Sequence, residues 1–144
     1  MSTLPKADDL EQLPEIEKQW AVKAMHHAET YFNLLSVLPG SKMKLTKMDT
    51  ELREDFESNF PEIDVAKLDE EDFKSPAAKN KWRPFIMKYE KILDDYNFGT
   101  LLRIRPDEDY TEANTMFVTR VQFLCIEVTR NQKGLNDVHC KPKA

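Results

Sequence analysis

Glycine is rare in this chain, and its scarcity limits the kinds of nucleotide site that the protein can contain. Only three of the 144 residues are glycine, and neither a GxxxxGK[ST] motif nor a GxGxxG motif occurs. Both motifs need glycines so that backbone amides can surround a phosphate. A GxSxG nucleophile elbow is missing as well. The common nucleotide-binding enzymes are therefore excluded, whereas other enzymes are not.

Cysteine is equally scarce. The chain has two cysteines, Cys125 in the apolar run FLCIEV and Cys140 in the polar stretch VHCKPKA. Neither belongs to a CxxC pair or to a metal-ligand spacing. We expect both to be reduced thiols, as is usual in the cytosol. A disulfide between them is left open, but no feature of the sequence supports one.

Long hydrophobic runs are also absent. No apolar stretch approaches the roughly 20 residues that a helix needs to cross a bilayer. The N-terminal segment MSTLPKADDLEQLPE has neither the basic start nor the apolar centre of a signal peptide. We therefore expect a cytoplasmic protein that does not associate with membranes.

The charged residues that are present are unevenly distributed. The net charge of −5 argues against a general nucleic-acid binder, and no direct DNA binding is expected. Residues 49–72 hold eleven acids and two bases, whereas residues 73–91 hold six bases and one acid. This asymmetry indicates faces that pair with each other, a bipolar surface for a partner, or ordinary solvated helix faces, and we favour the last interpretation.

Apolar spacing predicts three long helical segments. Residues from Ile16 to Leu38 repeat at intervals of three and four, which predicts a helix over 15–38 that begins near Pro14 and stops at Pro39. Asp49 can cap a helix over 49–60 that ends before a proline. A single turn capped by Asp69 is expected next, and Ser75 and Pro76 then start an apolar stripe that continues to Tyr96.

Pro84 lies inside that last stripe. Proline cannot donate the helical hydrogen bond to residue 80, which costs about 3 kcal/mol in a regular helix. The apolar period nevertheless continues in phase across it. We expect either a kinked helix or two helices joined near Arg83.

The remaining segments predict a small sheet and a closing helix. Alternation over residues 98–105 predicts a strand, and residues 42–46 are the best candidate for its partner. Residues 116–128 favour a helix that ends at Gly134, although their β-branched content leaves a strand open. The fold class is therefore mainly α with a small β element (α+β), with three or four main helices plus a short two-stranded hairpin or sheet. We divide the chain into a flexible arm (1–13), a single globular domain (14–134) and a flexible tail (135–144).

Few residues indicate chemistry. His26 and His27 point about 100° apart on a helix, so we expect no metal site there, with His27 buried and His26 at its edge. Glu127 lies in an apolar helix and needs a buried partner, which Arg103 or Arg130 can supply as a structural ion pair. The many acids of residues 49–72 are too solvated to act as a catalytic pair. We expect no catalytic residues and no cofactor.

Aromatic and basic residues are mixed in the second half of the chain. Such mixtures can stack on single-stranded RNA, but Trp82, Tyr89 and Tyr96 are seven residues apart on the apolar stripe. This spacing indicates packing in the core rather than a stacking platform.

Six blocks of the sequence carry a resemblance to a known family. They are, in order, QWAVKAMHHAETYFNLL, KLTKMD, KNKWRPF, DYNFGTLLR, YTEANTMF and TRVQFLCIEVTRNQKG. They resemble the small eukaryotic proteins named for a "polysaccharide biosynthesis" domain, over roughly residues 16–136. The family name derives from distant similarity to plant cell-wall proteins that include glucuronoxylan methyltransferases. This chain lacks the glycine-rich loop that such enzymes use for their cofactor.

The resemblance implies a non-enzymatic chaperone of translation elongation factor 1-alpha. Members of the family are associated with binding the nascent GTP-binding domain of that factor near ribosomes and with helping it fold. An enzyme of polysaccharide biosynthesis and a ribosome- or RNA-associated protein are the alternatives. The candidate partner-binding residues lie in the matching blocks: Trp82, Arg83, Phe98, Arg103, Tyr110 and Arg120.

Overall fold

The computed structural model describes residues 15–141. Its elements are α2 (Glu15–Leu35), the 3-10 turn η1 (Gly40–Lys42), α3 (Asp49–Asn59), α4 (Glu71–Lys74), α5 (Pro76–Met87), β1 (Gly99–Arg103), the 3-10 turn η2 (Glu112–Asn114), β2 (Thr115–Thr119), α6 (Arg120–Gln132) and the 3-10 turn η3 (Asp137–His139). The predicted mainly helical fold with a small two-stranded element is confirmed. Among the described residues no helix is long and apolar enough to span a membrane. The predicted N-terminal arm and Pro14 lie outside the described residues.

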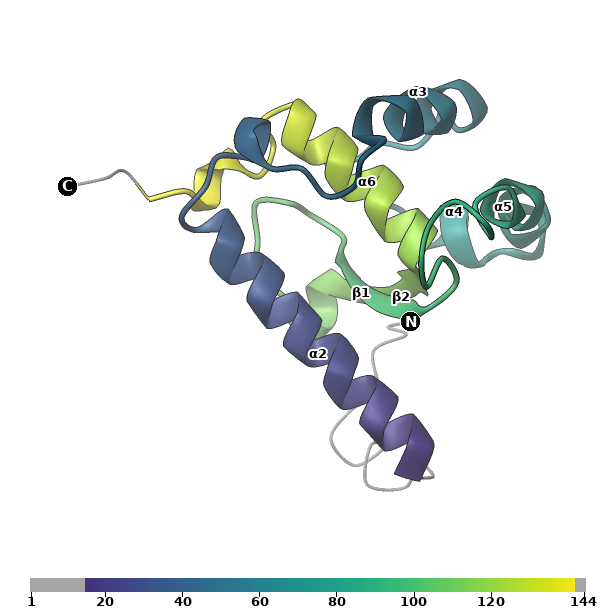
Figure 1. Cartoon of the computed structure of the whole chain (residues 1–144), viewed down its shortest axis with the longest axis horizontal. Coiled ribbons are helices and arrows are strands. Elements are labelled where there is room, and N and C mark those ends of the chain that lie inside the picture. Colours follow the sequence, from purple (N-terminus) through teal and green to yellow (C-terminus); the bar gives the residue numbers. More distant parts are fainter. Residues whose placement is uncertain (1–14, 142–144) are drawn as a thin grey trace.

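Helix α6 is the centre of the fold. Figure 1 shows α6 with α3, α4 and α5 on one side and the long helix α2 on the other, with the sheet beside it. Every residue of α6 from Val121 to Asn131 is buried. The main apolar cluster joins α6 to Leu35 of α2, Phe56 of α3 and Trp82 of α5. Because α6 is enclosed on all sides, its polar residues must find partners inside the protein.

The sheet pairs β1 with β2, not with residues 42–46 as the sequence predicts. The two strands are antiparallel, with Thr100 opposite Val118 and Leu102 opposite Met116. Residues 42–46 instead belong to a loop that Asp49 organises, because its carboxylate accepts hydrogen bonds from the amides of Leu45 and Thr46 at 2.9 and 2.7 Å. The sequence predicts Asp49 as the helix cap, but it is the first residue of α3 and its side chain bonds to the preceding loop.

The segment from residue 115 to 132 contains both a strand and a helix, the two alternatives that the sequence leaves open for residues 116–128. Residues 115–119 form a strand, and the helix begins at Arg120. Thr119 and Gln122 make a reciprocal capping box, which starts the helix directly after the strand. The predicted stop is confirmed: α6 ends at Gln132, and Gly134 adopts the positive φ of 75° that favours glycine after a helix.

Helix α5 ends earlier than its apolar stripe predicts. Ser75 accepts a hydrogen bond from the Ala78 amide and Pro76 lies in the first turn, as expected. Pro84 lies within the helix, which continues to Met87, so the helix is not divided at Arg83. Residues 88–97 form turns, and Ile92 is 59% exposed. The stripe beyond Met87 is therefore not one helical face.

The described part of the C-terminal segment is folded onto the domain. The sequence predicts a flexible tail from residue 135, but the Leu135 amide bonds to the Arg130 carbonyl at 2.9 Å. Asn136 is 1% exposed, and the Lys141 amide bonds to the Ser36 carbonyl at 3.0 Å. The prediction of a tail is thus wrong for residues 135–141, because their polar groups complete a buried network that the sequence pattern does not show.

Candidate partner-binding surfaces

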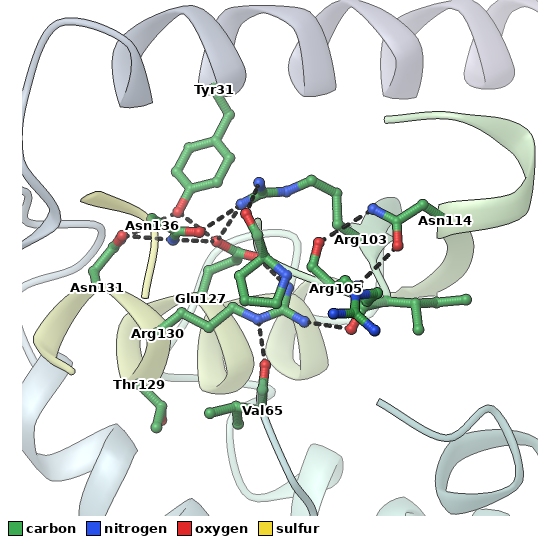
Figure 2. A network of polar contacts seen from close by, with 12 residues as sticks. Tyr31, Val65, Arg103, Arg105, Asn114, Glu127, Thr129, Arg130, Asn131 and Asn136 are labelled. Atoms are coloured by element: carbon green, nitrogen blue, oxygen red, sulfur yellow. Dashed lines mark hydrogen bonds and ion pairs between the residues drawn. The ribbon is translucent and has the colours of Figure 1, made fainter. Parts of the chain in front are cut away.

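A buried ionic network surrounds Glu127 on α6 (Figure 2). Its carboxylate accepts hydrogen bonds from Arg130 at 2.7 Å, from Arg103 at 3.4 Å and from the Tyr31 hydroxyl at 2.7 Å. Asn136 donates a further bond to the same carboxylate at 2.9 Å. Both arginines that the sequence offers as alternatives are therefore partners of this acid.

The charges of this network are fully enclosed. The side chains of Glu127, Arg103 and Arg130 have no exposed surface. Burial raises the pKa of Glu127, but the guanidinium groups of Arg130 and Arg103 outweigh it, so the pKa lies below its ordinary value. Arg130 also donates to the carbonyl oxygens of Val65 and Ile104. The network therefore holds loop, strand and C-terminal segment to α6 and has a structural role.

Two of the six candidate partner-binding residues belong to the interior. Arg103 is 0% exposed, and its guanidinium is held by Glu127, Asn136 and the Pro106 carbonyl. Trp82 is 1% exposed and stacks on Phe60 with ring centroids 3.8 Å apart. Burial of Arg103 does not favour direct contact with a partner, whereas Trp82, although buried, lines an open cavity between α5 and β2. The burial of Trp82 leaves one aromatic ring fewer for a stacking platform on RNA.

Arg83 lies beside an open cavity between α5 and β2, which we call the basic groove. Its volume is about 400 Å³. The apolar part of its lining includes Phe73, Trp82, Ile86 and Val118, and its charged part consists of Lys74, Lys79 and Arg83. Within the described part of the chain no acidic residue lines it. An apolar floor with a cationic rim is complementary to an apolar segment that carries acidic residues.

The bases of segment 73–91 differ in whether a carboxylate pairs with them, and those at the basic groove are unpaired. Lys81 pairs with Glu62 at 3.0 Å and Lys88 pairs with Asp55 at 2.8 Å, so these two bases pair with the acidic segment 49–72. Lys79 and Arg83 are one helical turn apart, and neither has a carboxylate partner among the described residues. The charge asymmetry therefore produces internal pairs on one face of α5 and leaves cations on the other.

Lys74 closes one end of the basic groove. Its ammonium group donates to the carbonyl oxygen of Phe117 in β2. Burial lowers the pKa of Lys74, and the charge of Lys79 lowers it further. A negative group bound in the groove would relieve this repulsion, so the local electrostatics favour an acidic occupant.

Phe98 and Arg120 lie together at a second, smaller cavity of about 150 Å³. Lys23 and His27 of α2 line it as well. Lys23 sits over the Phe98 ring, 5.3 Å from its centroid. Burial, and then the charge of Arg120, lowers the pKa of His27. His27 is half-buried rather than fully buried as the sequence predicts, and His26 is exposed.

Tyr110 lines a third cavity, which lies between α2 and the sheet and which we call the acidic cavity. Its volume is about 520 Å³, and its charged lining residues are Glu29 and Asp109. The Tyr110 ring meets Phe32 edge to face, with centroids 6.1 Å apart. Arg103 lies behind both rings, 5.6 Å from the centroid of Phe32 and 5.5 Å from that of Tyr110.

The six candidate residues are thus divided among three cavities and the core. Arg83 lies at the basic groove, Phe98 and Arg120 share the small cavity, and Tyr110 lies at the acidic cavity. The sequence analysis did not single out Lys74 of the basic groove or Glu29 of the acidic cavity. The helical spacing of Lys79 and Arg83 is the signal that identifies a common basic face. Among the described side chains no three His, Cys, Asp or Glu residues lie close enough to hold a metal ion.

Comparisons with known proteins agree with this architecture. A solution NMR structure of a Saccharomyces cerevisiae protein superimposes with a TM-score of 0.81 at 48% sequence identity, covering 96% of this chain and 95% of that one. The Schizosaccharomyces pombe protein named "Protein PBDC1 homolog" is 48% identical over 141 residues, which is 95% of this chain and 96% of that protein. The human "Protein PBDC1" is 46% identical over 123 residues, and the match spans 85% of this chain but only 53% of the human protein.

The fold and its surface define a small, mainly helical domain with an enclosed ionic centre and two larger open cavities whose charged residues have opposite signs. Residues 16–141 match the family described as "PBDC1 protein", and the chain belongs to that family. The resemblance that the sequence blocks indicate, to proteins named for a polysaccharide biosynthesis domain, is thereby confirmed.

Proposed function

We propose that this protein is a non-enzymatic chaperone that binds the nascent GTP-binding domain of translation elongation factor 1-alpha and assists its folding in the cytoplasm, near the ribosome. The proposal follows from the family resemblance. The observation that carries it on this molecule is the basic groove, whose apolar lining includes the half-buried Ile86 and the exposed Met87 beside Lys79 and Arg83. A nascent domain exposes apolar segments that it has not yet buried, and a groove of this kind can cover one of them.

The charge of the basic groove indicates which segments it would cover. Its three cations favour an apolar segment flanked by aspartate or glutamate, and they disfavour a basic one. Met87, which is 51% exposed at the edge of the groove, adds a flexible apolar contact that adapts to different side chains. Adaptable contact suits a partner whose structure is still forming.

Helix α3 offers a second surface that fits the same client. Glu51 and Glu54 are exposed and three residues apart, so they lie on one face of the helix. A GTP-binding domain without nucleotide presents basic phosphate-binding loops. An acidic helix face can cover such a loop until nucleotide binds.

Capture of ribosome-bound nascent chains tests this function. Ribosomes stalled while translating the GTP-binding domain are mixed with the protein, crosslinked and purified, and the crosslinked positions are mapped. We expect crosslinks from the basic groove to the GTP-binding domain and loss of capture in the double variant Lys79→Glu/Arg83→Glu. Lys44→Glu/Lys47→Glu is the matched control, because it makes the same charge change at two exposed lysines that line no described cavity. Equal capture by both variants, or equal capture of unrelated nascent chains, would contradict the proposal.

A further inference from the structure

The acidic cavity has features of a second recognition site, and its lining joins α2 to the sheet. Figure 1 shows α2 and α5 on different sides of the sheet. The residues of the cavity come from four parts of the chain, one of which is β1 with Leu101. Ala28, Glu29 and Phe32 belong to α2, Thr115 belongs to β2, and Asp109 and Tyr110 belong to the loop after β1. At about 520 Å³ the cavity is large enough for a long side chain together with parts of its neighbours.

Both charged groups that line this cavity are carboxylates. Glu29 and Asp109 are exposed, and neither forms an ion pair within the part of the chain that the structure describes. The carboxylate of Asp109 accepts a hydrogen bond from the Tyr110 amide at 2.6 Å. This bond fixes one carboxylate at the edge of the cavity, where it can meet a positive group.

Thr115, which lines the cavity, carries a buried hydroxyl without a partner. Thr115 is 1% exposed, and its Oγ1 atom makes no hydrogen bond within the described structure. Most buried polar atoms in folded proteins have a partner, so an unpaired one on a residue that lines a cavity points to a missing group. An ammonium or guanidinium N–H that enters the cavity can donate to this oxygen.

The aromatic walls are suited to the same kind of group. The guanidinium of Arg103 already lies against Phe32 and Tyr110 from the interior, at 5.6 and 5.5 Å from the ring centroids. Aromatic rings attract cations through the negative charge of their faces, and arginine makes such contacts most often. The walls are thus of a type that holds a cation, and the cavity opens beside the exposed side chain of Met25.

We propose that the acidic cavity binds a lysine or arginine side chain presented by a partner protein. The carboxylates of Glu29 and Asp109 receive the charged end, Thr115 accepts one of its N–H groups, and the apolar wall covers its stem. The exposed Val22 and Met25 on α2 provide an apolar border on which residues flanking the basic side chain can pack. This border favours a polypeptide over a free polyamine. The inference goes beyond the proposed chaperone function, because it holds whichever protein carries the side chain.

Titration of the full chain with a short peptide tests the site directly. The probe is acetyl-Leu-Arg-Leu-amide, followed through the backbone amide signals of Tyr110 and Thr115 by NMR. Its first control is the same peptide with citrulline, which keeps the shape of arginine and lacks its charge. We expect the arginine peptide to shift both signals and the citrulline peptide to bind about tenfold more weakly, which is the size expected for two solvent-accessible ion pairs.

Variants of the protein separate the site from general charge effects. Glu29→Gln/Asp109→Asn is expected to weaken arginine-peptide binding about tenfold, whereas Glu71→Gln/Asp94→Asn, with the same charge change at two exposed acids that line no described cavity, leaves it unchanged. Thr115→Val keeps the shape of the floor and is expected to weaken binding a few-fold while the circular dichroism spectrum stays the same. If the Glu29→Gln/Asp109→Asn protein does not fold, the arginine-peptide affinity of Thr115→Val alone decides whether the site exists.

Three outcomes would overturn the inference. They are equal binding of the citrulline peptide, equal weakening by the Glu71→Gln/Asp94→Asn control, and unchanged affinity in Thr115→Val. Spermidine binding at least as tightly as the arginine peptide would overturn the choice of a protein partner. Because the probe contains no sequence of the elongation factor, none of these results bears on the chaperone proposal.

Discussion

Glu127 and Arg130 form an ion pair at 2.7 Å in which neither side chain is exposed to solvent. The two residues are one turn apart on α6, and between them they contact α2, the loop at Val65, the end of β1 and the C-terminal segment. This pair therefore connects elements that are far apart in the sequence. Burying two charges costs solvation energy, which only a complete set of partners offsets.

Replacing Glu127 should destabilise the fold strongly. In Glu127→Gln the buried guanidinium groups of Arg103 and Arg130 lose the anion that both contact. We expect a loss of about 3–5 kcal/mol in the free energy of unfolding, measured by urea denaturation, because a buried charge without its partner costs that much. Glu62→Gln, which removes an exposed partner of Lys81, should cost about 1 kcal/mol or less. Similar losses in the two variants would show that the network is not central to stability.

Stability should fall as the solution becomes acidic, and part of this fall should depend on Glu127. The arginines hold the folded-state pKa of Glu127 below the ordinary value of 4.5. The unfolded chain therefore binds this proton at a higher pH than the folded protein, so the stabilisation is present above the ordinary pKa and is lost as pH falls through the folded one. Urea denaturation between pH 7 and 3 should show a smaller decline in Glu127→Gln than in the parent. Parallel declines would be inconsistent with a depressed pKa.

Removing residues 135–144 should destabilise the protein, whereas removing 142–144 should not. The longer deletion takes away Asn136, which bonds to Glu127, Asn131 and Arg103 in the interior. Leaving three buried polar groups without this partner is expected to cost about 3 kcal/mol or more. The shorter deletion keeps every one of these contacts. Thermal unfolding compares the two, and equal melting temperatures would restore the interpretation of residues 135–141 as a tail.

This C-terminal segment illustrates what the sequence can and cannot predict here. Helices α2 and α6, the glycine stop after α6 and the Ser75 cap follow from apolar spacing and local hydrogen bonding, which neighbouring residues determine. Helix α2 ends at Leu35, three residues before the predicted end at residue 38. Asn136 looks like any polar residue near a chain end. Its burial depends on a carboxylate nine residues earlier and on an arginine in a distant strand.

The difference between local signals and contacts with distant residues also explains the errors in strand pairing and in the candidate residues. Residues 42–46 alternate like a strand, but Asp49 binds their amides, and β2 supplies a closer partner for β1. Among the candidate residues, Arg103 and Trp82 have types that are common at interfaces, yet the ionic network and the aromatic cluster hold them inside. The cavities arise where α2 and α5 meet the sheet, which the pattern of a single helix does not reveal.

Gly40 should not tolerate a side chain. A Cβ atom added there would lie 2.8 Å from both the Cα and the side-chain oxygen of Asn131, because η1 packs closely against α6. Gly40→Ala should therefore lose about 1–3 kcal/mol of unfolding free energy through overpacking. Ser41→Ala at the exposed neighbouring position should stay within about 0.5 kcal/mol of the parent. Unchanged stability of Gly40→Ala in chemical denaturation would mean that the turn can move away from α6.

The most direct test of the proposed function is a measurement of folding yield. The GTP-binding domain of elongation factor 1-alpha is synthesised in a translation system depleted of this protein, and the fraction that becomes GTP-bound and protease-resistant is measured. We predict that adding the parent protein or Lys44→Glu/Lys47→Glu raises this fraction several-fold, and that Lys79→Glu/Arg83→Glu does not. A yield that is the same with and without the parent protein, or that is restored equally by all three, would contradict the role assigned to the basic groove.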